Sequence, residues 1–306
     1  MRIETHPSSS WKERVYAEWF RMGRRFRSLE RYVRQVRKRY LYAGETKEGG
    51  TGETKEHDLA GLVSHYTLLD AQGVYCGVPA DIRVCEGCLA RNPHKAAWNG
   101  EDIVTWRERW KKLLALADRV LLFSEASAQI VYRVFPLLRE KSLVRPHALG
   151  RFPQKRVAID CRNPMKIGVV GGLNFAKGAE IVRDLCALLP KGIEVVLVGE
   201  SDSEIRGLRV WGRYRREELP EILEKEGITV CLFSSVCPET FSYVTSELMA
   251  LGMPVACFDF GAQAEKTRDY PLGTVIPEVS AKAALEALTN LHCRSAVLQR
   301  ELRELP

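Results

Sequence analysis

The second half of the chain alternates between short apolar segments and longer amphipathic ones. The apolar segments have the length and the Val, Ile, Leu and Phe content of buried strands, and they cover 166–172, 194–200, 208–214, 228–235, 254–260 and 273–277. Helical periodicity fills the stretches between them, at 178–189, 217–226, 241–251 and 279–291. Such alternation predicts an α/β domain in which helices cover both faces of a parallel sheet. Ligands of such sheets bind beyond the carboxyl ends of the strands.

The pattern before residue 151 is less regular. It predicts a helix over 103–116, a strand over 119–124 and a further helix that ends at Pro136. Either Ser124 or Ser127 can cap this last helix, because serine hydroxyls accept hydrogen bonds from the free N–H groups of a first turn.

An apolar stripe at helical spacing runs through the first forty residues. Its members are Val15, Trp19, Met22, Phe26, Leu29, Val33, Val36 and Tyr40. Arginines fill much of the opposite face, which predicts a basic amphipathic helix over 11–40. Such a helix packs on its own protein or on a partner helix, or lies on an anionic membrane surface with its arginines at the headgroups. Nucleic acid is a third possibility, but no nucleic-acid-binding motif accompanies the charge.

The positive charge of the protein belongs to this helix alone. Residues 1–40 contain twelve Lys/Arg and four Asp/Glu, a net charge of +8, whereas the remainder has 34 basic and 35 acidic residues, a net charge of −1. The pentapeptide Gly-Glu-Thr-Lys-Glu then occurs at 44–48 and again at 52–56, and its composition is typical of a flexible linker. The predicted regions are a basic helical segment (1–43), a duplicated linker (44–56), a partial first domain (57–150) and a ligand-binding domain with a C-terminal helix (151–306).

Composition bounds the class of protein. The chain of 306 residues is 45% apolar and 28% charged, as in soluble globular proteins. It has no apolar run long enough to span a membrane and no apolar segment behind its N-terminal charges, so we expect neither a transmembrane helix nor a signal peptide. Nine cysteines, mostly within apolar runs, favour free thiols in a reducing compartment such as the cytoplasm.

Three cysteines have a spacing that suits a metal. Cys85 and Cys88 form a C-x2-C pair, and Cys76 precedes it by nine residues. Together with His65 or His57 they can supply the four ligands of a structural zinc. The alternative is a set of free thiols in a loop.

The first strand-to-helix junction carries candidate phosphate-binding groups. The strand ends at Gly171 and Gly172, and a helix opens near Lys177. Glycines permit close approach of the backbone to a ligand, helix N-termini favour anions, and a lysine adds a positive charge. The spacing matches neither the G-x-G-x-x-G fingerprint nor a P-loop, and a tight turn also explains the glycines.

A second candidate is the segment "PETFSYVTSELMALGMPV" (238–255). Glu239 follows a buried strand at the edge where ligands bind, and Glu247 lies about two turns into an apolar helix, so both carboxylates can point to one side. Glu239 can also serve only to complement the helix dipole. An unpaired buried carboxylate is costly, which favours a hydrogen-bonding task for Glu247.

These residues resemble the donor-site signature of glycosyltransferase family 4, retaining enzymes of the GT-B architecture. The signature consists of Glu239, Phe241, Ser242, Glu247 and the segment 251–255. The similarity extends over about 165–278 and is greatest to members that act in bacterial surface polysaccharide synthesis. It implies a GT-B-like fold with a complete Rossmann-like donor domain.

The resemblance also implies roles for individual residues. In the family the first glutamate contacts hydroxyls of the donor sugar and the second binds the nucleotide ribose, here Glu239 and Glu247. The residue that matches the lysine of the diphosphate is Lys177, and backbone N–H groups at Phe241, Ser242 and Tyr243 would face the same group.

Other positions of the motif match less completely. Arg213 falls in the loop that borders the nucleotide base, and His57 matches a histidine that approaches the donor sugar. The family commonly has an arginine where this chain has Gly172, which weakens the phosphate clamp. Only 56 residues precede His57, so the resemblance implies a truncated acceptor-side domain. Asp259 and Glu265 flank a Gly-Ala turn past a later strand, where either can reach a ligand, but capping of the loop is the favoured role.

The resulting prediction is transfer of a sugar from a nucleotide diphosphate sugar to a saccharide or lipid-linked acceptor, without a catalytic metal and on the inner membrane face. The first alternative is a non-catalytic nucleotide-sugar-binding relative or a subunit that needs a partner chain. The others are an NAD-dependent oxidoreductase, which lacks its glycine fingerprint here, and a membrane- or nucleic-acid-binding module based on residues 11–40.

Overall fold

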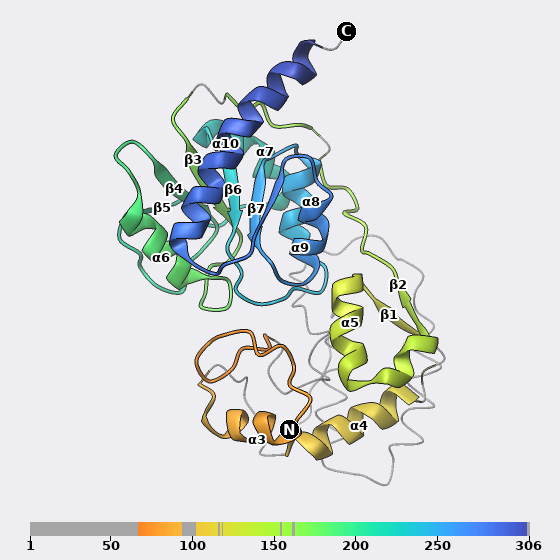
Figure 1. The fold of residues 1–306 in the computed structure, drawn as a ribbon. Coiled ribbons are helices and arrows are strands. Elements are labelled where there is room, and N and C mark those ends of the chain that lie inside the picture. The colour runs from red at the N-terminus through yellow and green to blue at the C-terminus, as the bar shows by residue number, and fades with distance from the viewer. Residues whose placement is uncertain are drawn as a thin grey trace, which may run out of the picture.

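The computed structural model describes residues 67–93 and 102–304, apart from 116, 118, 154 and 161–162 (Figure 1). The predicted basic helix over 11–40, the duplicated linker, His57 and His65 lie outside the described residues. Two sheets organise the described part, a small one near the middle of the chain and a larger one in its second half.

The larger sheet has six parallel strands. They are β3 (Lys166–Val170), β4 (Glu194–Val198), β5 (Leu208–Val210), β6 (Val230–Phe233), β7 (Val255–Phe258) and β8 (Gly273–Ile276). Their order is β5-β4-β3-β6-β7-β8, with Ile167 of β3 opposite both Val195 and Val230. The direction in which strands are added reverses between β3 and β6. Loops that leave these two strands therefore flank a topological switch point, the usual place for a ligand in this kind of sheet.

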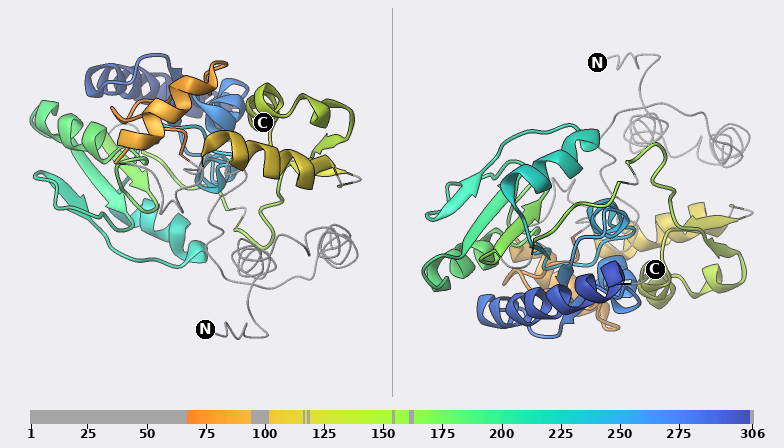
Figure 2. Two further views of the ribbon diagram at one scale, coloured as in Figure 1. Left: turned by 90° about the horizontal axis from the view of Figure 1, so that it is seen from below. Right: turned by 90° about the horizontal axis from the view of Figure 1, so that it is seen from above.

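Helices cover both faces of this sheet, as the sequence pattern predicts. One face carries α6 (Ala179–Leu188) and α10 (Ala281–Glu304), and the other carries α7 (Leu219–Glu226), α8 (Tyr243–Ala250) and α9 (Gly261–Arg268). Figure 2 shows α10 (blue) and α7 (turquoise) on opposite sides of the strands. The short 3-10 helix η3 (Arg216–Glu218) leads directly into α7.

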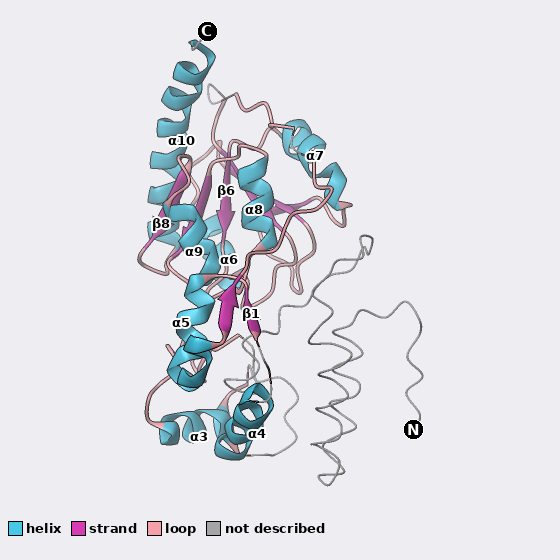
Figure 3. Ribbon diagram, turned by 90° about the vertical axis from the view of Figure 1, so that its right-hand side faces the viewer, coloured by secondary structure: helices cyan, strands magenta, loops and turns pink. Residues whose placement is uncertain are grey.

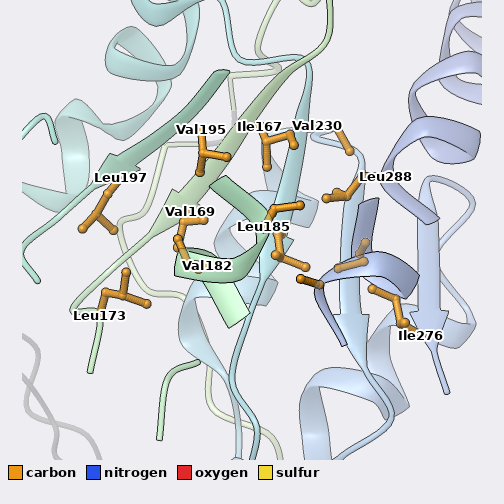
Figure 4. Packing of buried hydrophobic residues seen from close by; sticks show 14 of the residues in the cluster. Ile167, Val169, Leu173, Val182, Leu185, Val195, Leu197, Val230, Ile276 and Leu288 are labelled. Carbon is orange, nitrogen blue, oxygen red and sulfur yellow. The ribbon is translucent and has the colours of Figure 1, made fainter. Parts of the chain in front are cut away.

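Alternation of side chains along the strands builds two cores. On the α6 and α10 side, Ile167 and Val169 of β3 pack with Val182, Leu185 and Leu288 (Figure 4). The opposite face of the same strands packs against α7 and α8 through the residues Val170, Val196, Val198, Leu223 and Leu248. Because both faces are buried, the sheet and its carboxyl edge form a rigid base for the loops beyond it.

The smaller sheet pairs β1 (Val120–Leu122) with β2 (Ser142–Val144) in parallel, with Val120 opposite Ser142. Around it lie α3 (Ile82–Arg91), α4 (Ile103–Ala115), α5 (Glu125–Val134) and the 3-10 helix η2 (Pro136–Glu140). Their shared core contains Leu68, Ile103, Leu122, Ile130 and Leu138. Of the two predicted caps, Ser124 is the one that holds α5, since its hydroxyl accepts the N–H of Ser127 at 3.1 Å.

The strands and helices that the sequence predicts within the described ranges are all present, with shorter ends in most cases. The predicted helix over 241–251 begins at Tyr243, and the one over 279–291 continues to Glu304. Helices α3 and α9 and strand β2 were not predicted. In α9 the buried face includes the polar residues Gln263 and Thr267, so the helix has no apolar stripe that periodicity can detect.

The two sheets meet through helices α5 and α9, which lie one above the other in Figure 3. No helix in the described ranges has both the length and the apolar content needed to cross a membrane.

Candidate functional site

Two loops at the switch point bind each other. One follows β3 (171–178) and the other follows β6 (234–242). The N–H of Val236 donates to the carbonyl of Ala176 at 3.0 Å, and the Ser234 hydroxyl donates to the carbonyl of Lys177 at 2.6 Å. These contacts fix the first loop against the second and bring the two sequence-predicted segments together.

Gly178 makes this close approach possible. It has a left-handed backbone, with φ of 81°, and a Cβ at this position would lie 2.0 Å from the carbonyl oxygen of Ser234. A side chain there would clash with the opposite loop and also strain the backbone. Helix α6 begins at the next residue, Ala179, so the glycine also serves as its N-cap.

The loops bring Lys177 and Glu239 into a direct ion pair. The Lys177 ammonium donates a short hydrogen bond to the Glu239 carboxylate. The Glu239 side chain is only 6% exposed and that of Lys177 is 40% exposed. The carboxylate is thus the buried member of the pair, and the Lys177 side chain that reaches it is partly exposed.

Helix α9 holds the backbone of Glu239 on both sides. The Gln263 side chain accepts the N–H of Glu239 at 3.0 Å and donates to the carbonyl of Cys237 at 2.8 Å. The N–H of Ala262 donates to the carbonyl of Glu239 at 2.9 Å. A Cβ at Gly261 would lie 2.7 Å from backbone atoms of Glu239, so the contact requires glycine. Glu239 therefore stands in an irregular segment clamped by α9, and does not share a helical face with Glu247.

The start of α8 combines an unusual backbone with a basic side chain. Ser242 has a left-handed conformation (φ 59°, ψ 81°), and its hydroxyl pairs with that of Thr245 at 2.8 Å. The Lys266 ammonium of α9 lies 3.2 Å from the centroid of the Phe241 ring and donates to the Phe241 carbonyl. It also donates to the Ser246 hydroxyl at 2.7 Å. Strained, over-determined backbone of this kind is concentrated at ligand sites.

The second glutamate of the motif is also paired. Glu247 lies one turn into α8, with its side chain 5% exposed, and accepts a short hydrogen bond from Nε of Arg216. Burial raises the pKa of the Glu247 carboxyl above its ordinary value, the Arg216 hydrogen bond and charge oppose that rise, and nearby Glu217 adds to it. Burial and the charge of Glu247 together raise the pKa of the neighbouring Tyr214 hydroxyl.

The part of the chain before residue 151 contributes to the same site through α5. The Ser127 hydroxyl donates to the carbonyl of Thr240 at 3.2 Å. The Glu265 carboxylate of α9 accepts the N–H groups of Glu125 at 3.3 Å and of Ala126 at 2.7 Å. The sequence predicts a loop-capping role for Glu265, and it instead caps a helix 139 residues away in the chain. The loop after β6 is therefore enclosed between α9 and α5.

An aromatic cluster extends this junction. The His147 ring stacks on Phe123, with centroids 3.8 Å apart, and on Tyr243, with centroids 5.5 Å apart. The edge of Phe241 also meets it at 5.2 Å. Side chains from the segments around both sheets thus surround the start of α8.

Other predicted site residues occupy different surroundings. Arg213 pairs with Glu200 at 2.8 Å on an exposed surface beside the strand ends. Gly171 has φ of 105°, and a Cβ there would contact Val244 of α8 at 3.7 Å. Gly172 has open space where a Cβ would lie. Asp259 forms an ion pair with Arg268, the last residue of α9.

The predicted zinc site does not fit the structure. No three His, Cys, Asp or Glu residues among those described are placed to hold a metal ion. Cys85 faces the core between α3 and α4, with its sulfur 3.6 Å from Arg107, and the sulfur of Cys88 is 3.6 Å from the Asn92 amide. His65, the proposed fourth ligand, lies outside the described residues.

Sequence reasoning missed three residues that shape the site: Arg216, Gln263 and Lys266. Arg216 stands in the charged run "RYRREE" (213–218), which has the composition of a solvent-exposed turn. Gln263 and Lys266 lie in α9, which was not predicted. A signal was present only for Arg216, because a buried glutamate at 247 needs a cation nearby.

The comparisons agree with this architecture. The model of the family described as glycosyl transferases group 1 matches residues 155–300. The chain is similar to sucrose-phosphate synthase from Thermosynechococcus elongatus, with a TM-score of 0.52 and 18% identity over 69% of this chain and 65% of that one. It is also similar to Anabaena Alr3699/HepE in complex with UDP-glucose, with a TM-score of 0.51 and 17% identity over 61% and 57% of the two chains. No curated protein matches the sequence.

The chain thus spans 57% to 65% of the length of these two solved structures. The matched part contains the whole six-stranded sheet, both glutamates of the donor-site signature and Lys177. Residues 155–300 therefore match the model of the glycosyl transferases group 1 family, and their six-stranded sheet has the Rossmann-like α/β fold of the C-terminal domain of GT-B glycosyltransferases.

Proposed function

We propose that the protein is a retaining GT-B glycosyltransferase that moves a sugar from a nucleotide diphosphate sugar to a saccharide or lipid-linked acceptor. The observation that carries this proposal is that two carboxylates of the loop and helix after β6, Glu239 and Glu247, are both buried and each paired with a cation, beside the switch point of the sheet. The family match over 155–300 supports it, as does the fold shared with HepE, whose structure holds UDP-glucose.

Glu239 and Lys177 suit the sugar diphosphate end of the donor. The Glu239 carboxylate can accept hydrogen bonds from two neighbouring sugar hydroxyls, and its backbone is held in place by α9. Lys177 is the more exposed partner, so its ammonium can turn toward a diphosphate while the carboxylate remains fixed. As the bond between sugar and diphosphate breaks, a positive charge at this position stabilises the departing anion. Backbone N–H groups at the start of α8 can stabilise the same anion.

Glu247 suits the ribose. Its buried carboxylate has strong acceptor atoms and stands one turn beyond the diphosphate end of α8. A pair of ribose hydroxyls can use both oxygens of such a group. The two glutamates would then bind the two ends of one nucleotide sugar and set its direction along the sheet edge beside β3 and β6.

For the acceptor substrate we propose only a class, a saccharide or a lipid-linked acceptor. Members of the resembled family act in surface polysaccharide synthesis, and a basic helix over 11–40 would place the protein at an anionic inner membrane face, close to lipid-linked acceptors. A second candidate function is binding of the nucleotide sugar without transfer, alone or with a partner chain. It is favoured by Gly172, which stands where the resembled family commonly has an arginine and has open space where a Cβ would lie.

A thermal-shift screen tests donor binding. UDP, GDP, ADP and UDP-glucose are each added to the wild-type protein, to Glu247→Ala and to Glu226→Ala. Glu226 is a matched control, because its side chain is 4% exposed and pairs with Arg209 at 2.9 Å, but it ends α7 at the opposite edge of the sheet. We expect at least one nucleotide to raise the Tm of the wild type and of Glu226→Ala, and to have little effect on Glu247→Ala.

If none of the four ligands stabilises the wild type, the donor-site proposal is wrong. Release of free sugar from the stabilising nucleotide sugar, measured over hours, then separates the two candidate functions. Slow hydrolysis that disappears in Glu239→Gln supports a transferase, and tight binding with no release supports a non-catalytic binder.

A further inference from the structure

Arg216 is the least expected member of the site. It opens η3 just before α7, and its guanidinium enters the protein to reach Glu247. The Phe152 ring centroid lies 4.9 Å from its Cζ atom, and the Tyr243 ring centroid lies 5.9 Å away. Two aromatic rings and a carboxylate therefore restrict the guanidinium to one orientation.

One donor of this guanidinium is unused. Nη2 of Arg216 is buried and has no hydrogen-bond partner in the part of the chain that the structure describes. Buried charged donors without an acceptor are costly and rare in folded proteins, so this donor requires an acceptor from outside the described residues. Since Nη2 belongs to the same rigid plane as Nε, an acceptor that reaches it lies beside the Glu247 carboxylate.

The pair Arg216–Glu247 thus offers donor and acceptor atoms side by side. A ligand that complements it needs hydroxyl groups for the carboxylate and an acceptor oxygen next to them. A ribonucleoside has both, because its ribose carries two adjacent hydroxyls and its sugar and base carry further oxygens. A phosphate has oxygens but no hydroxyl pair.

We propose that Arg216 is a specificity-determining residue for the nucleoside part of the donor, with Nη2 donating to a nucleoside oxygen while Nε holds Glu247 in place for the ribose hydroxyls. This inference rests on the proposed function. Lysine cannot replace arginine in the role, because an ammonium is a single charge and lacks the planar fork that serves two acceptors at once.

Titration calorimetry of uridine and UDP, or of guanosine and GDP if GDP is the nucleotide that binds, tests the assignment with Arg216→Lys and Arg216→Met. We expect both variants to bind nucleoside and nucleoside diphosphate at least about 10-fold more weakly than the wild type, by the same factor for the two ligands. The matched control is Arg209→Met, which removes an arginine from the buried Glu226 and should bind both ligands like the wild type.

The pH dependence separates recognition from a purely structural role. The groups facing Glu247 from the described residues are Arg216, Tyr214 and Glu217, and Arg216 is the cation among them. Without that cation the buried carboxyl should hold its proton to higher pH, so nucleoside affinity of Arg216→Met should increase from pH 5.5 to pH 8 more steeply than that of the wild type. A general loss of packing would weaken binding equally across this range.

The outcomes are distinguishable. If the wild type binds no nucleotide, the proposed function and this inference both fail. If the wild type binds and Arg216→Lys binds as tightly, the inference alone is wrong. If Arg216→Lys weakens the diphosphate but leaves the nucleoside unchanged, Arg216 acts on phosphate and the assignment to the nucleoside is overturned. Arg216→Lys keeps the charge beside Glu247, so it remains informative if Arg216→Met does not fold.

Discussion

The carboxylate of Glu265 accepts a hydrogen bond from the backbone N–H of Ala126 at 2.7 Å, although 139 positions of sequence separate the two residues. The acceptor lies on α9 and the donor in the first turn of α5. The negative charge of Glu265 therefore complements the dipole of α5 at its N-terminus. Its neighbours Gln263 and Lys266 bind the loop that carries Glu239 and Phe241. Helix α9 is therefore the element that connects the two regions with the candidate site.

Replacing Glu265 by alanine should destabilise this junction. The N–H groups of Glu125 and Ala126 would lose their acceptor, and loss of such a helix cap costs about 1 kcal/mol. We expect the Tm from differential scanning calorimetry to fall by roughly 2–4 °C. Glu265→Gln keeps an acceptor oxygen and should lose less. Glu286→Ala, at an exposed position of α10, serves as the control, and an equal loss in both alanine variants would remove the special role of Glu265.

Replacing Lys177 by methionine should weaken phosphate binding selectively. The variant loses the positive charge that pairs with Glu239 and that is proposed to face the diphosphate. We expect the affinity for the nucleoside diphosphate to fall at least about 10-fold, or about 1.4 kcal/mol, and that for the nucleoside to change little. Calorimetry with both ligands provides the comparison, and Lys177→Arg should recover part of the loss. An equal effect on nucleoside and diphosphate would contradict the assignment of Lys177.

Replacing Gly178 by alanine should separate the two loops of the site. A Cβ there would lie 2.0 Å from the carbonyl oxygen of Ser234, in addition to the strain of a side chain at φ of 81°. Gly192→Ala is a matched control with φ of 92° and open space around its Cβ. The control should lose about 1–2 kcal/mol, the cost of the left-handed backbone alone.

Gly178→Ala should lose clearly more than this in urea-induced unfolding, and it should also weaken nucleotide binding, because Lys177 would move with the loop. Equal losses of stability in the two glycine variants would mean that the loop relaxes without penalty and that the close contact with Ser234 does not hold the site together.

Replacing Glu247 by glutamine should stabilise the protein most at neutral pH. The pKa of the folded Glu247 carboxyl is raised from its ordinary value of 4.5 by burial, so the folded state binds the proton more tightly than the unfolded chain. Its contribution to stability therefore falls as pH rises from 4.5 through the raised pKa and is constant above it. Glutamine does not titrate, so its contribution to stability does not depend on pH. The Tm of the variant relative to the wild type should therefore increase over the same pH range, by about 2–4 °C for each kcal/mol of stability that the wild type loses.

Thermal unfolding of both proteins from pH 4.5 to pH 8 provides the measurement. A difference in Tm that is independent of pH would show that folding does not raise the pKa of the Glu247 carboxyl. The same variant should bind nucleotide more weakly, since an amide has one acceptor oxygen in place of two. A gain in stability with a loss of binding is the expected signature of a residue kept for its ligand.

Much of the fold could be predicted because apolar residues recur with different periods in the strands and in the helices of the second half of the chain. The apolar segments around Ile167, Val196 and Leu232 have no polar face, and the structure buries them between two layers of helices. Glu247 stood out for the same reason, as a carboxylate within an apolar run, and its side chain is indeed 5% exposed. Periodicity and burial are local properties that one sequence can show.

The rest depends on contacts between distant residues. The buried face of α9 includes Gln263 and Thr267, whose polar atoms are satisfied by the loop after β6 and by the helix itself, and no pattern within eight residues shows those partners. Arg216 lies in a run of exposed charges and is distinguished only by its proximity to Glu247. The cysteine spacing was misleading, because α3 directs Cys85 into a core shared with α4.

Helix α9 also limits which N-terminal regions can be joined to the domain that contains the six-stranded sheet. A different first region would have to present a helix N-terminus to Glu265 and a hydroxyl to the carbonyl of Thr240, or leave these groups without their present partners. A fragment that begins after residue 150 would lack both contacts as well as the His147 ring. Chimeras and shortened forms that are intended to preserve the loop after β6 should therefore retain the stretch from Ser124 to His147 together with the domain that follows.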